Sequence, residues 1–336
     1  MRAMQLQHIA PIDSSPLREV ELPDPIPSPG ELRIRVKCCA ICRTDLHVIE
    51  GDLPAAKMPV IPGHQVVGVV DALGPGCSRF KPGDRAGIAW LRHTDGICKY
   101  CKTGRENLCP DSLYTGYHAD GGYAQFALVP EDFAYAMPDI FTDVEAAPLL
   151  CAGIIGYRAM LRSEIRPGGN LALYGFGSSA HVVLQLARHR GCEVYVVSRG
   201  ENHRRFALEL GAKWAGEDAA GMPVKADAAI LFAPAGRLVP PALAALDRGG
   251  VLALAGIHMS PIPPLDYDTY LFQERDIHPV TANTRADGRE LLAQAALVPV
   301  RPHVVAYPLS EANRALQDMK ADRIDGTGVL MVDDAA

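Results

Sequence analysis

The chain has 336 residues, which predicts roughly two domains at about 150 residues per domain. Its net charge is −6, with 21% charged and 48% hydrophobic residues, and it lacks the basic excess typical of nucleic-acid binding. No apolar run reaches the roughly 18 residues of a membrane span, and the N-terminal MRAMQLQHIAP lacks the apolar core of a signal peptide. We therefore expect a cytoplasmic enzyme that binds neither nucleic acid nor a membrane.

The first half of the chain carries strand patterns separated by turn residues. Apolar and polar residues alternate over 31–40, and this period of two predicts a half-buried strand. Its inner face is predicted to hold Leu32, Ile34, Val36 and Cys38, and its outer face Arg33, Arg35, Lys37 and Cys39. Pro and Gly clusters, such as DPIPSPGE before this strand and FKPGD after it, favour an irregular β-barrel-like domain.

The pattern changes near residue 150, where strands and helices begin to alternate. Residues 170–197 predict a strand, a glycine turn (GFGSSA), a helix (HVVLQLARHR) and a second strand (EVYVV). The helix is predicted to turn Val182, Val183, Leu186 and Ala187 inward and His181, Gln185 and Arg188 outward. The runs ADAAILFA and GVLALAGI, separated by a helical PPALAALDRG, continue the series. The economical prediction is a doubly wound parallel sheet of α/β class.

The tail after about Thr284 is different again. It predicts a helix at 288–297, a strand at 301–309, a helix at 310–321 and a last strand at 327–332.

Gly175, Gly177 and Ala180 form a G-x-G-x-x-A fingerprint between the first predicted strand and its helix. The first glycine permits the tight turn, the second lets a pyrophosphate approach the backbone, and the small third residue allows close helix packing. In this strand–turn–helix context the fingerprint predicts a dinucleotide site at the helix N-terminus.

The end of the second strand distinguishes between nicotinamide cofactors. An acidic residue there would bind the ribose 2′-hydroxyl of NAD, but this chain has Ser198 and Arg199, with Arg204 and Arg205 a turn later. A hydroxyl and guanidinium groups suit a 2′-phosphate, so we expect NADP(H) to be preferred over NAD(H). The alternative is that these are ordinary solvated surface residues.

Seven of the nine cysteines fall in the first third of the chain, too sparsely for a disulfide scaffold. The spacing Cys98-x2-Cys101-x7-Cys109 suits a tetrahedral Zn²⁺ held in a loop. Asp95 stands where a fourth ligand would be expected, so we predict a structural zinc site with three thiolates and one carboxylate. The alternative is a reduced loop without metal.

Two more candidate ligands, Cys42 in AICRTDLH and His64 in PGHQVVGVV, lie in loops at strand ends. Considered alone, Cys42 could be a small core residue and His64 a turn residue, with no functional role. Taken together, the sequence resembles the zinc-dependent alcohol dehydrogenases of the medium-chain dehydrogenase/reductase superfamily over essentially its whole length. The matching motifs are the catalytic stretch 42–47 and the glycine signature Gly63, His64, Gln65, Gly68, Gly74 and Cys77.

The resemblance implies a GroES-like, β-rich catalytic domain (1–149 and 284–336) around a Rossmann dinucleotide-binding domain (150–283). It implies that Cys151 joins Cys42 and His64 as the third ligand of a catalytic zinc, whose open position takes the substrate alkoxide. Thr44 would then accept the alcohol proton and His47 would deliver it to solvent.

Two neighbours of these residues also have roles in the family. Asp45 would hydrogen-bond the other nitrogen of His64, or alternatively only cap a helix, and Arg43 would contact the cofactor pyrophosphate. A pocket role for Trp90 and Leu91 competes with ordinary core packing.

The implied function is a zinc-dependent alcohol dehydrogenase or carbonyl reductase that transfers hydride between a small alcohol and NADP(H), acting as a homodimer or homotetramer. Two residues depart from the family pattern: Gln65 replaces an acid, and Asp95 replaces the first structural cysteine. A zinc-free quinone or enoyl reductase, or a non-catalytic NADPH-binding zinc protein, are the alternatives. The Thr44 and His47 pair argues against a mere binding protein.

Overall fold

A computed structural model describes residues 1–332, which fold into two compact units. One unit comprises Met1–Cys151, Ala282–Ala296 and the chain from Pro302 onward, and the other comprises Ala152–Thr281 and Leu297–Arg301. The first is rich in antiparallel strands and the second is a parallel sheet with helices, so the predicted α/β fold class is confirmed.

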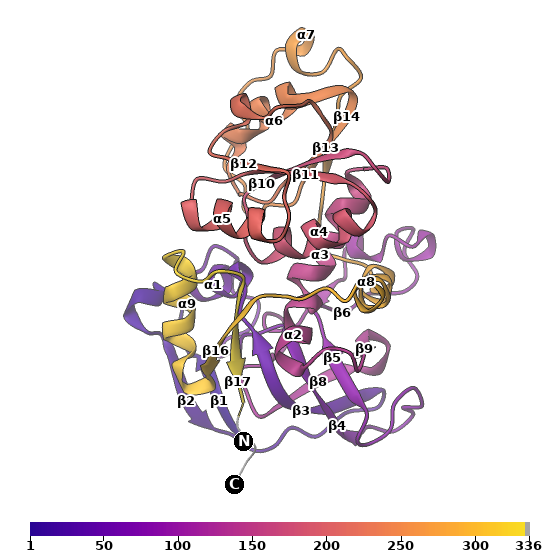
Figure 1. The fold of residues 1–336 in the computed structure, drawn as a ribbon. Helices are drawn as coiled ribbons and strands as arrows, with labels where there is room; N and C mark the ends of the chain where they lie inside the picture. Colours follow the sequence, from indigo (N-terminus) through magenta and orange to yellow (C-terminus); the bar gives the residue numbers. More distant parts are fainter. Residues whose placement is uncertain (333–336) are drawn as a thin grey trace. The chain divides into compact units, whose positions relative to one another are not determined.

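The first unit is built on a seven-stranded sheet that combines strands from residues 31–136 with strands from residues 304–331 (Figure 1). Two strand pairs, β1 (Arg2–Leu6) with β2 (Leu17–Glu21) and β6 (Leu91–His93) with β7 (Leu113–Tyr114), lie outside it. The sheet runs in the order β16 (Val304–Pro308), β17 (Thr327–Met331), β3 (Glu31–Ala40), β4 (Gln65–Leu73), β5 (Arg85–Ile88) and β9 (Ala134–Ala136), with β8 (Phe126–Pro130) paired to β3.

The register between β3 and β4 brings the loops that contain Cys42 and His64 to the same end of this sheet. The strands are antiparallel, and the last residue of β3, Ala40, pairs with the first residue of β4, Gln65. Cys42 therefore leaves β3 at the point where His64 enters β4.

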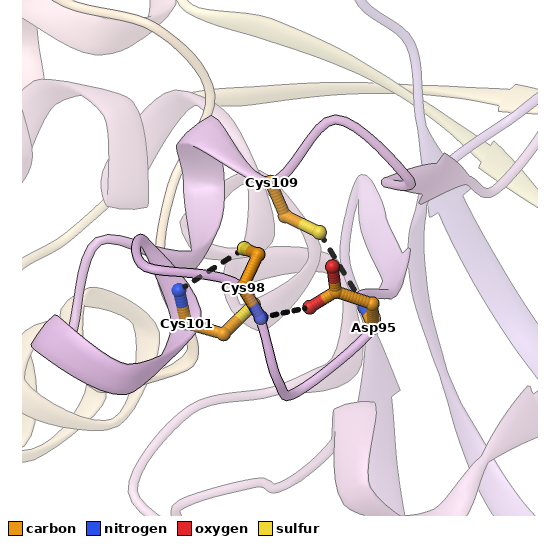
Figure 2. A group of neighbouring side chains, drawn as sticks. All are labelled: Asp95, Cys98, Cys101 and Cys109. Atoms are coloured by element: carbon orange, nitrogen blue, oxygen red, sulfur yellow. Dashed lines mark hydrogen bonds between the residues drawn. The ribbon is translucent and has the colours of Figure 1, made fainter.

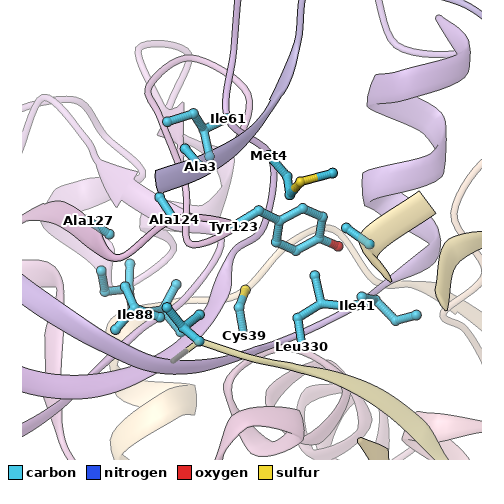
Figure 3. Close-up of a cluster of buried hydrophobic side chains, with 14 of the residues drawn as sticks. Ala3, Met4, Cys39, Ile41, Ile61, Ile88, Tyr123, Ala124, Ala127 and Leu330 are labelled. Atoms are coloured by element: carbon cyan, nitrogen blue, oxygen red, sulfur yellow. The ribbon is translucent and has the colours of Figure 1, made fainter. Parts of the chain in front are cut away.

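Strand β3 has the predicted alternation of inner and outer side chains except at its end. Cys39, predicted to face outward, is fully buried like Cys38. Figure 3 shows the reason: Cys39 faces the apolar side chains of Tyr123 and Met4, which come from outside this sheet. The strand is thus covered on both faces where it approaches Cys42.

Four helices belong mainly to this unit: α1 (Arg43–Glu50), α2 (Asp143–Ala146), α8 (Arg285–Leu297) and α9 (Ala312–Lys320). Among residues 1–332 no single helix is long and apolar enough to cross a membrane, and the bent pair Asp143–Leu150 and Ala152–Arg162 passes that test only when taken together.

The second unit is a six-stranded parallel sheet with the strand order of a doubly wound nucleotide-binding fold. The order is β12 (Trp214–Gly216), β11 (Glu193–Val197), β10 (Asn170–Tyr174), β13 (Ala226–Leu231), β14 (Leu246–Leu254) and β15 (Asp276–Pro279). The helices of this unit are α3 (Ala152–Arg162), α4 (Ser178–His189), α5 (Glu201–Glu209), α6 (Val239–Ala245) and α7 (Tyr267–Tyr270).

Two details of this unit differ from the predictions. Helix α6 ends at Ala245, earlier than predicted, because Leu246 already pairs with β13 before a register shift. His181, predicted to face outward from α4, is fully buried, and its ring lies 6.0 Å from that of Phe206 on α5. The neighbouring helix therefore covers a face of α4 that its sequence pattern marks as polar.

Candidate metal and cofactor sites

Cys42, His64 and Cys151 converge in the first unit, although 109 residues separate the two cysteines. Cys42 is the N-cap of α1, His64 precedes β4, and Cys151 follows a short 3₁₀ turn at 147–150. Their candidate ligand atoms all lie within 4.8 Å of one another, and the two Sγ atoms are 3.9 Å apart. Two Zn–S bonds of about 2.3 Å at a tetrahedral angle would place sulfurs about 3.8 Å apart, so the observed spacing fits zinc.

The His64 ring provides a second test of that fit. The residue is fully buried, and Nε2 has no hydrogen-bond partner among the described residues. A buried polar nitrogen without a partner is costly. A metal ion bound between this nitrogen and the two sulfurs would satisfy it, so these residues fit the ion that the sequence predicts.

The carboxylate of Asp45 connects two residues of this cluster through hydrogen bonds. One carboxylate oxygen accepts a hydrogen bond from Nδ1 of His64 at 3.1 Å. The other accepts the backbone N–H of Cys42 at 2.8 Å and the hydroxyl of Tyr123 at 3.0 Å. Asp45 thus both caps α1 and orients the imidazole, and the two roles weighed as alternatives from the sequence occur together.

The charges around this cluster favour a bound cation. Burial lowers the pKa of His64, but the neighbouring Asp45 and Cys42 more than offset this and raise it to about 10. The hydrogen bond from Cys151 lowers the pKa of the Cys42 thiol well below its ordinary value and raises that of Cys151. Negative charge therefore gathers at the cluster, where a proton or a metal ion would balance it.

Helix α1 carries the other residues predicted for catalysis. Thr44 is buried, with its hydroxyl oxygen 3.6 Å from the Cys42 sulfur, and His47 follows one turn later on the same face. Nδ1 of His47 lies 2.8 Å from a carboxylate oxygen of Asp52, a partner absent from the sequence-based prediction. Arg43 is exposed at the start of the helix.

Gln65, the residue that follows His64 in the chain, is also buried. Its side-chain amide donates to the backbone carbonyls of Ala40 and Ile41, at 3.3 and 3.2 Å. The amide thus connects the start of β4 to the backbone immediately before Cys42.

An aromatic side chain lies beside His64, the candidate ligand. The indole of Trp90 meets the His64 ring edge-on at 4.9 Å and stacks on Tyr114, also at 4.9 Å with an interplanar angle of 12°. Leu91, by contrast, is buried in the apolar core. Only Trp90 of this predicted pair therefore lies beside the ligand set.

Asp95, Cys98, Cys101 and Cys109 form a second convergent cluster in the first unit, with ligand atoms within 4.8 Å of one another (Figure 2). One oxygen of Asp95 accepts the backbone N–H groups of Cys98 at 3.0 Å and of Ile97 at 2.9 Å. These donors, led by Cys98, hold the pKa of the Asp95 carboxyl well below its usual range. The four residues present three sulfurs and an ionised carboxylate, a donor set that suits zinc.

An ion pair fixes the loop between the last two cysteines of this cluster. The guanidinium of Arg285 binds the carboxylate of Glu106 through both oxygens, at 2.6 to 3.1 Å, and stacks on Phe133. The backbone N–H of Arg285 donates to the same carboxylate at 2.7 Å.

In the second unit, the glycine fingerprint lies between β10 and α4. Gly175 has φ +88°, a conformation that favours glycine, and Gly177 is the N-cap of α4 with open space where a side chain would project. Ala180 is fully buried in the first turn of the helix. The open turn and helix N-terminus together form a cradle that suits a pyrophosphate.

The residues predicted to select the cofactor lie at the end of β11. Ser198 is buried, with 7% of its surface exposed, whereas Arg199 is exposed. The guanidinium of Arg204 donates to the backbone carbonyls of Ser198 and Arg199, at 2.8 and 2.6 Å. Arg204 therefore braces the loop that presents Ser198 and Arg199.

Comparison with known proteins agrees with this architecture. Residues 28–139 match the alcohol dehydrogenase GroES-like domain family, and residues 179–296 match the zinc-binding dehydrogenase family. The chain is 54% identical to a probable alcohol dehydrogenase AdhA of Mycobacterium tuberculosis, over 99% of this chain and 97% of that protein. It is 38% identical to an alcohol dehydrogenase of Geobacillus stearothermophilus, over 94% of both.

Solved structures give the same result. A cinnamyl alcohol dehydrogenase from Sorghum bicolor superimposes with a TM-score of 0.90 at 29% identity, covering 98% of this chain and 97% of that one. A cobalt- and zinc-bound thermostable alcohol dehydrogenase from Pyrobaculum aerophilum gives 0.88 at 27% identity, covering 98% and 99%. The chain belongs to the zinc-binding alcohol dehydrogenases of the medium-chain dehydrogenase/reductase superfamily, which confirms the resemblance read from its sequence.

Removing the hydroxyl of Tyr123 is expected to weaken the Asp45 network. The buried carboxylate would lose one of its donors, so Tyr123→Phe should lower the free energy of unfolding by about 1.5–3 kcal/mol, as measured by urea denaturation. Tyr135→Phe is the matched control, because the Tyr135 hydroxyl is buried in the same unit with no partner among residues 1–332. Equal losses in the two variants would contradict the role given to Tyr123.

Proposed function

We propose that this protein is an NADP(H)-dependent alcohol dehydrogenase that interconverts small alcohols and aldehydes or ketones. Cys42, His64 and Cys151 would hold a catalytic zinc. The observation that carries the proposal is the buried Nε2 of His64, which has no hydrogen-bond partner in residues 1–332 and lies beside two thiols whose sulfurs are 3.9 Å apart. A zinc-free reductase would have no chemical need to bring Cys42, His64 and Cys151 together.

Each component of the site has a defined chemical task. A zinc ion held by two thiolates and an imidazole would act as a Lewis acid that makes the substrate hydroxyl more acidic. NADP⁺ would accept the hydride from the carbinol carbon, which leaves a carbonyl product. Asp45 keeps the His64 ring oriented by its bond to Nδ1.

The proposed proton relay uses two residues of α1, which a ribose hydroxyl of the bound cofactor would connect. Thr44 has a hydroxyl that both accepts and donates hydrogen bonds, and it lies next to a ligand sulfur. We assign it to take the substrate proton, and His47, one turn on and partly exposed, to deliver that proton to water. One alcohol thus loses a hydride to the cofactor and a proton to solvent.

The preference for NADP(H) is proposed from the end of β11. No acidic residue stands there to bind a ribose 2′-hydroxyl, and Glu201 lies beyond Gly200 on α5. Ser198 and Arg199 supply a hydroxyl and a positive charge for a 2′-phosphate. Arg204 would support them through the carbonyls it already binds. Gly175, Gly177 and Ala180 are assigned to the pyrophosphate.

A second zinc ion is proposed for Asp95, Cys98, Cys101 and Cys109, with a structural role. Because one Asp95 oxygen already accepts two backbone N–H groups, we assign the other oxygen as the ligand. All nine cysteines are free thiols, which suits the reducing cytoplasm in which we place the protein.

Zinc analysis of purified variants tests both metal assignments. We expect two zinc ions per chain in the wild type and one in both Cys42→Ser and Asp95→Ala. Cys42→Ser should also lose at least about 10³-fold in turnover, because Lewis-acid assistance is worth several kcal/mol, whereas Asp95→Ala should keep most of its activity. Cys77→Ser, which changes a thiol outside both clusters, is the control. Retention of both ions in Cys42→Ser would refute the catalytic site.

The cofactor preference is tested by Arg199→Ala. Loss of a charge-assisted bond to the 2′-phosphate should reduce kcat/KM for NADPH by about 10- to 100-fold. The value for NADH, which has no 2′-phosphate, should change little. Arg248→Ala is the control, because Arg248 is another exposed arginine of the same unit and lies on β14, outside the residues predicted to bind the cofactor. Wild-type enzyme that uses NADH as efficiently as NADPH would refute the preference.

A homodimer or homotetramer is proposed from one edge of the second unit. Strand β15 is an edge strand, and the preceding segment exposes Tyr267 and Phe272, each by about 60%. We expect Phe272→Lys to lower the mass measured by light scattering relative to wild type, while Ile97→Lys, another exposed apolar residue, leaves it unchanged. A monomeric wild-type protein would disprove the assembly.

A further inference from the structure

The contact between His47 and Asp52 is created by the turn that ends α1. Gly51 closes the helix with φ +83°, and the backbone N–H of Leu53 donates to the carbonyl of His47 at 3.2 Å. This turn brings Asp52 back against the helix, with a carboxylate oxygen 2.8 Å from Nδ1 of His47. The imidazole is largely covered and Asp52 is about half exposed, with side-chain exposures of 17% and 54%.

The position of Asp52 does not favour the helix itself. The C-terminal end of a helix carries partial negative charge, so an acid beyond it gains nothing from the helix dipole. A half-exposed ion pair also contributes little to folding stability. The contact with His47 is therefore not explained by the helix dipole or by the stability of the ion pair.

The chemistry of the pair determines the tautomer of His47. An ionised carboxylate only accepts hydrogen bonds, so Nδ1 must carry the hydrogen. In the neutral ring the lone pair then lies on Nε2, which is the nitrogen that accepts a proton.

We propose that Asp52 is a positioning residue for proton transfer, an inference that rests on the proposed role of Thr44 and His47. Asp52 keeps His47 in the Nδ1–H form, so that Nε2 takes the proton passed on from Thr44. The imidazolium then releases one proton to water and returns to its starting state. Asp52 accepts this hydrogen bond throughout and acts on the reaction through His47.

A double-mutant cycle measures this coupling. In single-turnover oxidation of an alcohol by zinc-loaded enzyme, Asp52→Asn should slow the reaction by about 10-fold, the lower limit for loss of a carboxylate behind a functional histidine. In separate steady-state assays, the KM values for alcohol and NADP⁺ should stay within about 2-fold of wild type if only transition-state interactions are lost. In a His47→Gln background the same change should have no further effect, because both residues act in one step. Asp13→Asn, which removes another exposed carboxylate of the first unit, is the control and should keep the wild-type rate.

Nitrogen NMR of protein labelled with ¹⁵N-histidine gives a readout independent of turnover. The His47 signals are identified by their loss in His47→Gln, and the spectra are recorded at a pH where the ring is neutral. We expect the Nδ1–H tautomer in the wild type and a shift toward Nε2–H in Asp52→Asn, since an amide can donate to Nδ1.

The outcomes separate this inference from the proposed function. An unchanged His47 spectrum in Asp52→Asn, or an equal loss of rate with and without His47, would overturn the role of Asp52. A His47→Gln enzyme with the wild-type rate would instead refute the proton path, while the spectra would still decide whether Asp52 sets the tautomer.

Discussion

The buried carboxylate of Asp45 links three segments that are distant in the sequence. It accepts hydrogen bonds from the imidazole of His64, the backbone of Cys42 and the hydroxyl of Tyr123. A buried carboxylate is stable only with such donors, and each donor is fixed in turn by its hydrogen bond to the carboxylate. One side chain therefore sets both the start of α1 and the orientation of the His64 ring.

This arrangement concentrates negative charge where the ligand atoms meet. Asp45 is 2% exposed, and the thiol of Cys42 deprotonates readily because Cys151 donates to it. Burying several like charges is unfavourable unless a cation compensates them. A divalent ion would balance two thiolates, leaving Asp45 paired with the polarised His64. The local fold and the affinity for metal thus depend on the same electrostatic balance.

The sequence predicts those parts of the site that depend on short spacing or strand pattern. The cluster at 95–109 and the turn from Gly175 to Ala180 are local, so their residues alone identify them. Cys151 could be assigned only through family resemblance, because 109 residues separate it from Cys42. The aromatic stack on Trp90 and the hydroxyl of Tyr123 depend on tertiary packing that no periodicity encodes. Burial of His181 was mispredicted for the same reason: the covering ring comes from another helix.

Gln65 shows how a change in one residue can be absorbed by its surroundings. The family has an acid at this position, but here two backbone carbonyls, those of Ala40 and Ile41, face the side chain. Carbonyls need a donor, which an amide supplies and a carboxylate does not. A buried carboxylate in the same place would repel both oxygens and add to the negative charge around His64. With glutamine, the backbone before Cys42 is held by a neutral group, so the charge at the ligand set is governed by Asp45 and the thiols alone.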